Sequence, residues 1–327
     1  MSRERLESDD ALPTCEDVLA AARRIADWVR HTPVLVSEEL DSRFGGRLLF
    51  KCENLQRVGA FKFRGAANAV RMLEPARRER GVVTHSSGNH GAALALAARL
   101  SGLPATVVMP DNSAAPKKAA VAKYGAEIVY CSPGRIARER TLADIVSRTG
   151  AEIIHPYNDD RVIAGQGTAA LELLAAHPEI DVLMAPVGGG GLLSGTALAA
   201  RGQRRRIEVL GIEPEQADDA WRSFTSGSLV QLDAPDTIAD GLRASLGDRT
   251  FALITKHVDD ILRVSEAEIV AAMRLLYEEL RIVIEPSCAV PMAAILAGRF
   301  APRGRSVGII LTGGNVDLDR LPWRSGP

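Results

Sequence analysis

Residues 58–66 read VGAFKFRGA, and this stretch places Lys62 between two phenylalanines that are flanked by glycine and alanine. The preceding residues 48–52, LLFKC, have the apolar character of a strand. A lysine among apolar groups has a lowered pKa because its charged form is poorly solvated, so its amine can act as a nucleophile or a base. Lys62 is therefore a candidate Schiff-base lysine. The alternative is an ordinary lysine at a helix start whose ammonium group reaches solvent.

The composition is that of a globular chain large enough for one large core or two lobes, with 327 residues, 46% of them hydrophobic and 25% charged. The formal net charge of -1 gives no reason to expect nucleic acid or an anionic membrane as a partner. No apolar run reaches the ~18 residues that a membrane helix needs. The four cysteines are far apart and form no CxxC pair, which favours free thiols and a cytoplasmic location.

Short apolar runs alternate with helical patterns along most of the chain. The predicted strands are 34–36, 48–50, 82–84, 105–109, 127–130, 152–154, 182–185, 207–212, 260–264, 281–284 and 307–311. Many of these runs are continuously apolar, which is typical of strands buried on both faces. The alternation predicts an α/β fold with mainly parallel sheets and helices on both faces. The number of strands favours two lobes over one open sheet.

In a parallel α/β fold, ligands bind at the carboxyl ends of the strands, so the residues that follow each strand are of interest. Residues 85–91, HSSGNHG, follow the strand at 82–84 and place hydroxyls, an amide and an imidazole in a turn before a helix. Such a turn offers side-chain donors and free helix N–H groups to an anion. The alternative is an ordinary polar turn in which Asn89 caps the helix.

Four glycines follow the strand at 182–185, namely Gly188, Gly189, Gly190 and Gly191. Glycines between a strand and a helix let backbone N–H groups converge on a phosphate. A dinucleotide fingerprint would need glycine at position 193 or 194, where the chain has Leu193 and Ser194. The spacing therefore indicates a site for a single phosphate. A nicotinamide enzyme, with Glu213 as the ribose ligand, is the alternative from another reaction class.

Two further strand ends carry polar residues. Carboxylates at 213–219, EPEQADD, could bind a hard cation through oxygen, but composition alone favours a solvated acidic helix start. Thr312 with the two glycines after it suggests close approach of the backbone to a ligand, or a plain turn. A Schiff-base lysine, a phosphate site and two small polar turns share one economical explanation, which is pyridoxal 5'-phosphate.

These motifs resemble those of the fold-type II pyridoxal-phosphate enzymes, in the branch of the serine/threonine dehydratases and serine racemases. The resemblance runs from about residue 31 to residue 318. Further motifs that carry it are IAGQGT at 163–168, TIADG at 237–241 and Glu285-Pro286. It implies a large cofactor-binding domain, residues 1–80 and 159–327, and a small mobile domain, residues 81–158. It also implies a homodimer.

The resemblance implies a role for each motif. Lys62 would hold the cofactor aldehyde as a Schiff base and, once freed, take the substrate Cα proton. Gly188 to Gly191 would bind the phosphate, and Thr312 would face the pyridine nitrogen. Phe61 and Asn89 would position the cofactor ring, with Asn89 near its 3'-oxygen. The residues around the substrate carboxylate would be Ser86, Ser87, Asn89 and His90.

The same resemblance favours a cation site at residues 213–219 over the solvated acidic helix start that composition alone suggests. Glu213, Asp219 and the backbone carbonyl of Ala217 match the divalent-cation site of this group, so bound Mg²⁺ or Ca²⁺ is expected there. A hydroxyl at Thr312 cannot protonate the ring nitrogen as a carboxylate would. The ring is then a weaker electron sink, which favours prompt loss of a β-substituent over a long-lived carbanion.

The function expected from these observations is β-elimination of water from L-serine- or L-threonine-type 3-hydroxy amino acids, giving a 2-oxo acid and ammonia. One alternative is a serine racemase with side dehydratase activity. Ser87 favours it, because a hydroxyl on the cofactor face opposite Lys62 could serve as the second acid/base that racemisation needs. The other alternative is a threo-3-hydroxyaspartate ammonia-lyase, which a basic residue near the substrate β-carbon would favour.

Overall fold

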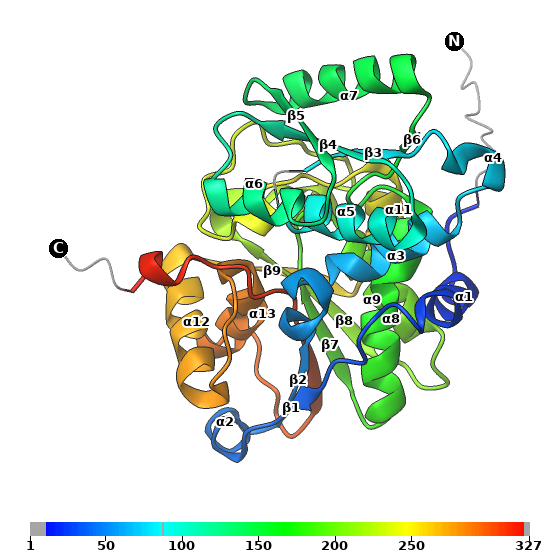
Figure 1. The fold of residues 1–327 in the computed structure, drawn as a ribbon. Helices are drawn as coiled ribbons and strands as arrows, with labels where there is room; N and C mark the ends of the chain where they lie inside the picture. The colour runs from blue at the N-terminus through cyan, green and yellow to red at the C-terminus, as the bar shows by residue number, and fades with distance from the viewer. Residues whose placement is uncertain (1–10, 87, 324–327) are drawn as a thin grey trace, which may run out of the picture.

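The computed structural model describes residues 11–86 and 88–323, and its strands form two separate sheets (Figure 1). The larger sheet has six strands in the order β1-β2-β10-β7-β8-β9. Its strands are β1 (Val34–Leu35), β2 (Arg47–Cys52), β7 (Val182–Pro186), β8 (Glu208–Pro214), β9 (Asp260–Val264) and β10 (Ser306–Leu311). All neighbours run parallel except β1 and β2. The expected α/β fold with mainly parallel sheets is confirmed.

The smaller sheet has four parallel strands in the order β5-β4-β3-β6. These are β3 (Val82–His85), β4 (Ala105–Pro110), β5 (Glu127–Cys131) and β6 (Glu152–Ile153). They all fall within the expected small domain, residues 81–158. The exact boundaries of the two domains, and the mobility of the smaller one, stay predictions.

Helices cover both faces of both sheets (Figure 1). The helices beside the larger sheet are α1 (Cys15–Ile25), α2 (Glu38–Phe44), α3 (Lys62–Arg71), α8 (Asp160–Ala176), α9 (Gly191–Arg201), α10 (Asp219–Ser226), α11 (Asp248–His257), α12 (Glu266–Leu280) and α13 (Pro286–Leu296). Those beside the smaller sheet are α4 (Pro75–Arg78), α5 (Asn89–Ser101), α6 (Ala115–Ala122) and α7 (Arg135–Thr149). Among the described residues, no helix has both the length and the apolar character to cross a membrane.

The continuous apolar runs are explained by burial on both sides of the larger sheet. Along β2, Leu48 and Phe50 face the core under α12 and α13, while Leu49 between them faces the core under α8 and α9. All three are fully buried. Because strand side chains alternate in direction, a strand covered on both faces needs apolar residues at every position.

One predicted strand is wrong. Residues 281–284 form no strand, because Arg281 has a φ of 55° and ends α12 in the left-handed conformation. The carbonyl of Val283 then accepts from Asn54 Nδ2 at 3.0 Å, and the N–H of Glu285 donates to the carbonyl of Gly313 at 3.0 Å. This segment is a loop that delivers Glu285 to the end of β10.

A buried ionic cluster joins α3, which begins at Lys62, to the larger sheet. Arg64 is fully buried and donates to both oxygens of Glu53, with Nε–Oε2 at 2.7 Å and Nη2–Oε1 at 2.8 Å. Its Nη1 donates to Glu172 Oε1 on α8, also at 2.7 Å. Lys51 on β2 completes the cluster by donating to Glu172 Oε2 and to the Thr32 carbonyl. Two cations and two carboxylates balance one another, as buried charges require.

This cluster predicts a large loss of stability on removing Arg64. Arg64→Met should lower the free energy of unfolding by about 3–5 kcal/mol, because it leaves Glu53 buried without its partner. Arg274→Met is the control, since Arg274 pairs with Glu278 on an exposed helix face and should change stability by about 0–1 kcal/mol. Equilibrium urea unfolding measures both. Similar small losses in the two variants would contradict this role of Arg64.

Candidate active site

The predicted site residues come together in a cleft of about 2390 Å³ between the two sheets. Of the residues predicted from the sequence, the cleft is lined by Phe61, Lys62, Ser86, Asn89, His90, Gly188, Gly189, Gly190, Gly191 and Thr312. Ser87 lies outside the described residues. The predicted metal ligands Glu213, Ala217 and Asp219 are not among the lining residues.

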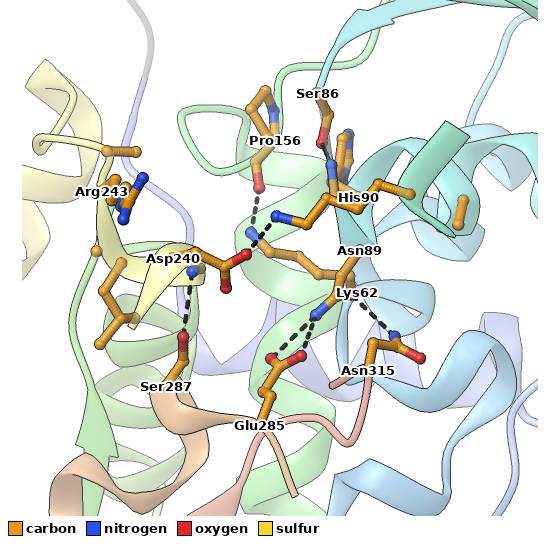
Figure 2. Close-up of a pocket in the computed structure, with 18 of the residues that line it drawn as sticks. Lys62, Ser86, Asn89, His90, Pro156, Asp240, Arg243, Glu285, Ser287 and Asn315 are labelled. Atoms are coloured by element: carbon orange, nitrogen blue, oxygen red, sulfur yellow. Dashed lines mark hydrogen bonds and ion pairs between the residues drawn. The ribbon is translucent and has the colours of Figure 1, made fainter. Parts of the chain in front are cut away.

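Lys62 is the first residue of α3 and its amine projects into the cleft (Figure 2). Its Nζ donates to the carbonyl of Pro156 at 2.9 Å and lies 5.1 Å from the centre of the Phe61 ring. Burial lowers the pKa of Lys62 to about 8, although the nearby Glu285 carboxyl opposes this shift. A substantial fraction of the amine is therefore neutral, and nucleophilic, near pH 7–8.

The segment that carries Lys62 is held beside the end of β10. The N–H of Phe61 donates to the carbonyl of Thr312 at 3.0 Å, and Ala60 pairs with Gly313 in an isolated β-bridge. The Thr312 hydroxyl oxygen is buried and has no hydrogen-bond partner among the described residues. An unpaired buried hydroxyl is costly unless a ligand atom satisfies it.

The four glycines form the turn from β7 into α9, where no side chain would fit. A Cβ on Gly189 would lie 2.3 Å from the Tyr157 ring, and one on Gly188 would lie 2.9 Å from Leu242 Cα. Gly190 has a φ of 84°, which strongly favours glycine. The turn therefore places bare backbone N–H groups at the N-terminus of an eleven-residue helix, an arrangement suited to a phosphate.

Asn89 does not cap α5 with its side chain, contrary to the alternative considered from the sequence. Gly88 is the N-cap residue and Asn89 is the first residue of the helix. The Asn89 amide instead contacts Glu285 and Asn315, which belong to loops of the larger sheet (Figure 2). Glu285 is buried, which raises its pKa to about 7 in spite of the hydrogen bond from Asn89.

Three imidazoles, those of His85, His90 and His155, lie around Lys62 in the cleft. Burial lowers the pKa of His85 and of His155 to about 4, and that of His90 well below its ordinary value. All three rings are therefore neutral at pH 7. The Nδ1 atom of His155 accepts from the N–H of Asn158 at 2.9 Å, so its proton is on Nε2.

A half-buried arginine borders the cleft on the side of the smaller sheet. Arg138 on α7 lies close enough to His85 to contribute to lowering its pKa. Arg138 donates from Nε to the carbonyl of Gly134, and it forms no ion pair with any residue that the structure describes. Its neighbour Arg135, by contrast, pairs with Glu139 on the same helix. Arg138 thus offers an uncompensated positive charge to a ligand.

Sequence reasoning missed Arg138, His155 and Tyr157 as site residues and gave Glu285 no role. Arg138 lies within a charged helical run, RIARER, in which no single arginine stands out. His155 and Tyr157 do follow a strand end, the position at which the other site residues were found. Extending the same test to the strand at 152–154 would have detected them.

The predicted metal ligands lie together between β8 and α10. Glu213 and Asp219 are buried, and Ala217 ends the short turn between them. Glu213 accepts from the N–H groups of Ala220 and Trp221, and Asp219 Oδ2 accepts from the N–H of Leu246. Burial raises the pKa of Asp219 to about 7 and that of Glu213 well above its usual range, with Asp219 adding to the shift at Glu213.

The described residues contain no group of three or more His, Cys, Asp or Glu side chains that could hold a metal ion. The predicted set has only two carboxylates, and a backbone carbonyl supplies its third oxygen. Asp218 does not add to it, because Arg222 and Arg263 pair with it at 2.7 and 2.8 Å. Two buried carboxylates of like charge are nevertheless a donor set that a hard cation would stabilise.

Comparison with known proteins identifies the family. Residues 25–313 match the family model described as "Pyridoxal-phosphate dependent enzyme". The chain belongs to this family of pyridoxal-phosphate-dependent enzymes. The orphaned Thr312 hydroxyl, the glycine turn and the buried Lys62 amine fit that cofactor on structural grounds. Within it, the chain is a fold-type II enzyme of the serine racemase, threonine dehydratase and hydroxyaspartate dehydratase group, which confirms the resemblance seen in the sequence.

Relatives of named activity are similar over nearly the whole chain. A β-hydroxyaspartate dehydratase of Paracoccus denitrificans is 51% identical, covering 95% of this chain and 99% of its own length. An L-threo-3-hydroxyaspartate ammonia-lyase of Saccharomyces cerevisiae is 48% identical, covering 94% and 95%. The structure of maize serine racemase superposes with a TM-score of 0.92 at 44% identity, covering 96% of this chain and 97% of the maize chain.

The lowered pKa of Lys62 predicts how fast the cofactor attaches. The rate of reaction between the cofactor-free protein and pyridoxal 5'-phosphate should rise with pH and level off above about pH 8, because only the neutral amine is nucleophilic. Stopped-flow absorbance at a series of pH values measures it. Lys62→Ala should not react in this way. A rate that keeps rising to about pH 10, the range of an ordinary lysine, would contradict the assignment.

Proposed function

We propose that this enzyme is a 3-hydroxyaspartate ammonia-lyase. It eliminates water from the substrate to give an enamine, which becomes an imine and is hydrolysed by water to a 2-oxo acid and ammonia. The observation that carries the proposal is the unpaired Arg138 at the cleft, beside the neutral His85. A second carboxylate on the substrate would satisfy this charge, whereas serine and threonine have none. The similarity to two relatives named for hydroxyaspartate supports the same substrate class. The L-serine or L-threonine dehydratase expected first from the sequence is less well supported.

Each group of site residues has a separate role in this proposal. Gly188 to Gly191 hold the cofactor phosphate, and Thr312 offers a neutral hydroxyl to the ring nitrogen. The bound cofactor supplies the electron sink that makes the substrate Cα proton acidic. Lys62 takes that proton, since its lowered pKa of about 8 leaves roughly a tenth of the amine neutral at pH 7 and about half at pH 8. Ser86 and the backbone N–H of His90, at the start of α5, bind the α-carboxylate. Asn89 positions the cofactor ring, and Arg138 binds the distal carboxylate.

A panel of 3-hydroxy amino acids tests the function. The enzyme is incubated with each stereoisomer of 3-hydroxyaspartate, with L-serine and with L-threonine, and release of ammonia and 2-oxo acid is measured. At least one hydroxyaspartate isomer should be turned over more than about tenfold faster than L-serine, the factor expected from one charge-assisted hydrogen bond. Faster turnover of L-threonine than of every hydroxyaspartate isomer would contradict the proposal.

Serine racemase is the second candidate. The observation in its favour is the serine at position 87, together with the similarity to maize serine racemase. Chiral chromatography of L-serine incubations distinguishes the two activities. Formation of D-serine at a rate comparable to ammonia release from hydroxyaspartate would favour the racemase.

Arg138 should determine the choice of substrate. Arg138→Ala should lower kcat/KM for 3-hydroxyaspartate by about 10- to 100-fold, the loss expected for a hydrogen bond to a charged group, and that for L-serine by less than about threefold. Steady-state kinetics with the two substrates measure the ratio. Arg148→Ala is the control, since Arg148 lies on the same helix and does not line the cleft. An equal loss for both substrates would exclude a role of Arg138 in binding the distal carboxylate.

We also propose that Glu213, Asp219 and the Ala217 carbonyl bind Mg²⁺ or Ca²⁺, and that the enzyme is a homodimer. Light scattering of the purified enzyme tests the dimer.

Thermal unfolding tests the metal site. A cation that binds only the folded protein raises its unfolding temperature. Addition of either ion after treatment with a chelator should therefore raise the unfolding midpoint.

Asp219→Asn should abolish this thermal shift, because it removes one of the two ligand charges. Glu215→Gln is the matched control, since Glu215 lies in the same turn but is partly exposed and faces Arg299. It should leave the shift unchanged. The absence of any shift in the original protein at millimolar ion concentrations would rule out the proposed metal site.

A further inference from the structure

A row of three side chains connects the two sheets beside Lys62. Asn315, which follows β10, donates from Nδ2 to the carbonyl of Val58 at 2.8 Å and to Asn89 Oδ1 at 2.9 Å. Asn89 begins α5 in the smaller lobe and donates from Nδ2 to both oxygens of Glu285, at 3.0 and 3.1 Å. Figure 2 shows Asn89 between these two partners.

The chemistry of the two ends gives this row a direction. A backbone carbonyl can only accept, so the Val58 carbonyl requires Asn315 to present its NH₂ group on this side. That group then meets the carbonyl oxygen of the Asn89 amide. At the other end, Glu285 can only accept once it is ionised, above its pKa of about 7, and it then requires the NH₂ group of Asn89. Both ends therefore select the same orientation of the Asn89 amide.

The nearly equal distances from Asn89 Nδ2 to the two Glu285 oxygens fit one N–H directed between them. An amide NH₂ group has two hydrogens, so the second remains available to a ligand in the cleft, which Asn89 lines. If the amide were flipped, the cleft would instead meet its oxygen, which cannot donate.

Glycines make room for this row. A Cβ on Gly59 would lie 2.7 Å from the Asn315 side-chain oxygen, and a Cβ on Gly313 would lie 2.6 Å from a Glu285 oxygen. Val58, whose carbonyl begins the row, has a φ of 57°, which is unusual for a β-branched residue and costs about 1–3 kcal/mol. A strained residue and two obligatory glycines at these contacts indicate that the row is a specific feature of the fold.

We propose that Asn315 and Glu285 are positioning residues that fix the Asn89 amide so that its free N–H is directed toward the 3'-oxygen of pyridoxal 5'-phosphate when the cofactor is bound. The inference rests on the proposed cofactor-binding role of Asn89. A hydrogen-bond donor there stabilises the ionised form of that oxygen, whereas a flipped amide would place two acceptors against each other. Because Asn89 belongs to one lobe and its partners to the other, the orientation is fixed only when the two lobes meet.

Two substitutions of Asn315 separate orientation from packing. Asn315→Asp keeps the shape but replaces the donor by acceptors, so it repels the Val58 carbonyl and selects the flipped Asn89. Asn315→Ala removes the side chain and leaves Asn89 held by Glu285 alone. The isosteric Asp variant should therefore be more damaging than the truncation, the reverse of what a packing role predicts. Asn315 is exposed, so neither change disturbs the core.

The measurements are the affinity of the cofactor-free protein for pyridoxal 5'-phosphate, by fluorescence titration, and the absorption spectrum of the bound cofactor as a function of pH. Asn315→Asp should weaken affinity by about 10- to 100-fold and Asn315→Ala by about 2- to 10-fold, the ranges for charged and neutral hydrogen bonds. Only the Asp variant should show a large change in the pH at which the spectrum shifts. Asn112→Asp, which adds the same charge elsewhere on the cleft wall, should leave both readouts unchanged.

A double-variant comparison isolates the role of Asn89. In an Asn89→Ala background, the Asp and Ala substitutions at position 315 should bind the cofactor equally well, because no amide is left to orient. If Asn315→Asp, in the otherwise unchanged protein, binds the cofactor as tightly as Asn315→Ala does, the proposal is overturned. The cofactor role of Asn89 would remain intact in that case. Failure of the unsubstituted protein to bind the cofactor would overturn both.

Discussion

The partial burial of the Lys62 amine at the wall of the cleft is the constraint on which the rest of the site depends. An ammonium group on a flexible surface chain has a pKa near 10.4, and the lowered pKa of Lys62 requires a surrounding that solvates its charged form less well than water does. That surrounding is built by contacts on each side of the lysine. The backbone N–H of Phe61 donates a hydrogen bond to the Thr312 carbonyl, and the Lys62 amine donates one to the Pro156 carbonyl. Two residues further along the chain, Arg64 forms ion pairs with Glu53 and Glu172.

A second lysine, Lys51, lies near the same elements but has different partners. Lys51 on β2 is fully buried, but it donates to Glu172 and to the Thr32 carbonyl, both at 2.7 Å. Its amine is held in an ion pair inside the protein, and Lys51 is not among the residues that line the cleft. The amine of Lys62 donates instead to a neutral carbonyl, that of Pro156, and it forms no ion pair with any described residue. The two lysines therefore differ in their partners and in their access to the cleft, which Lys62 lines.

The glycine-rich segments serve two distinct physical purposes. Around Gly188 to Gly191 the missing side chains expose backbone N–H groups at a helix start, which is the purpose expected from the sequence. After Thr312 the glycines were expected to admit a ligand. The structure shows that Gly313 admits the Glu285 carboxyl and that Gly314 admits the Val283 carbonyl. A glycine in a sequence indicates a close approach but not which group approaches.

The sequence was sufficient to predict most of the strands and to find Lys62 and the glycine turn, which the structure brings to the cleft, because those features are local. Continuous apolar runs such as Leu48 to Phe50 identify strands covered on both faces, and the residues after them identify the site edge. Residues 281–284 have the same apolar character, but their conformation is determined by the left-handed Arg281 and by a distant contact with Asn54. Likewise, the side chain of Asn89 is set by Glu285 and Asn315, each about 200 residues away in the chain. Such pairings are tertiary contacts that no local pattern contains.

The central claim is that Lys62, and not Lys51, is the reactive lysine of a pyridoxal-phosphate enzyme. Borohydride reduction of the enzyme loaded with the cofactor, followed by proteolysis and mass spectrometry, tests it most directly. The account predicts one covalent adduct per chain, on the peptide that contains Lys62. An adduct on Lys51, or no adduct at all, would contradict it.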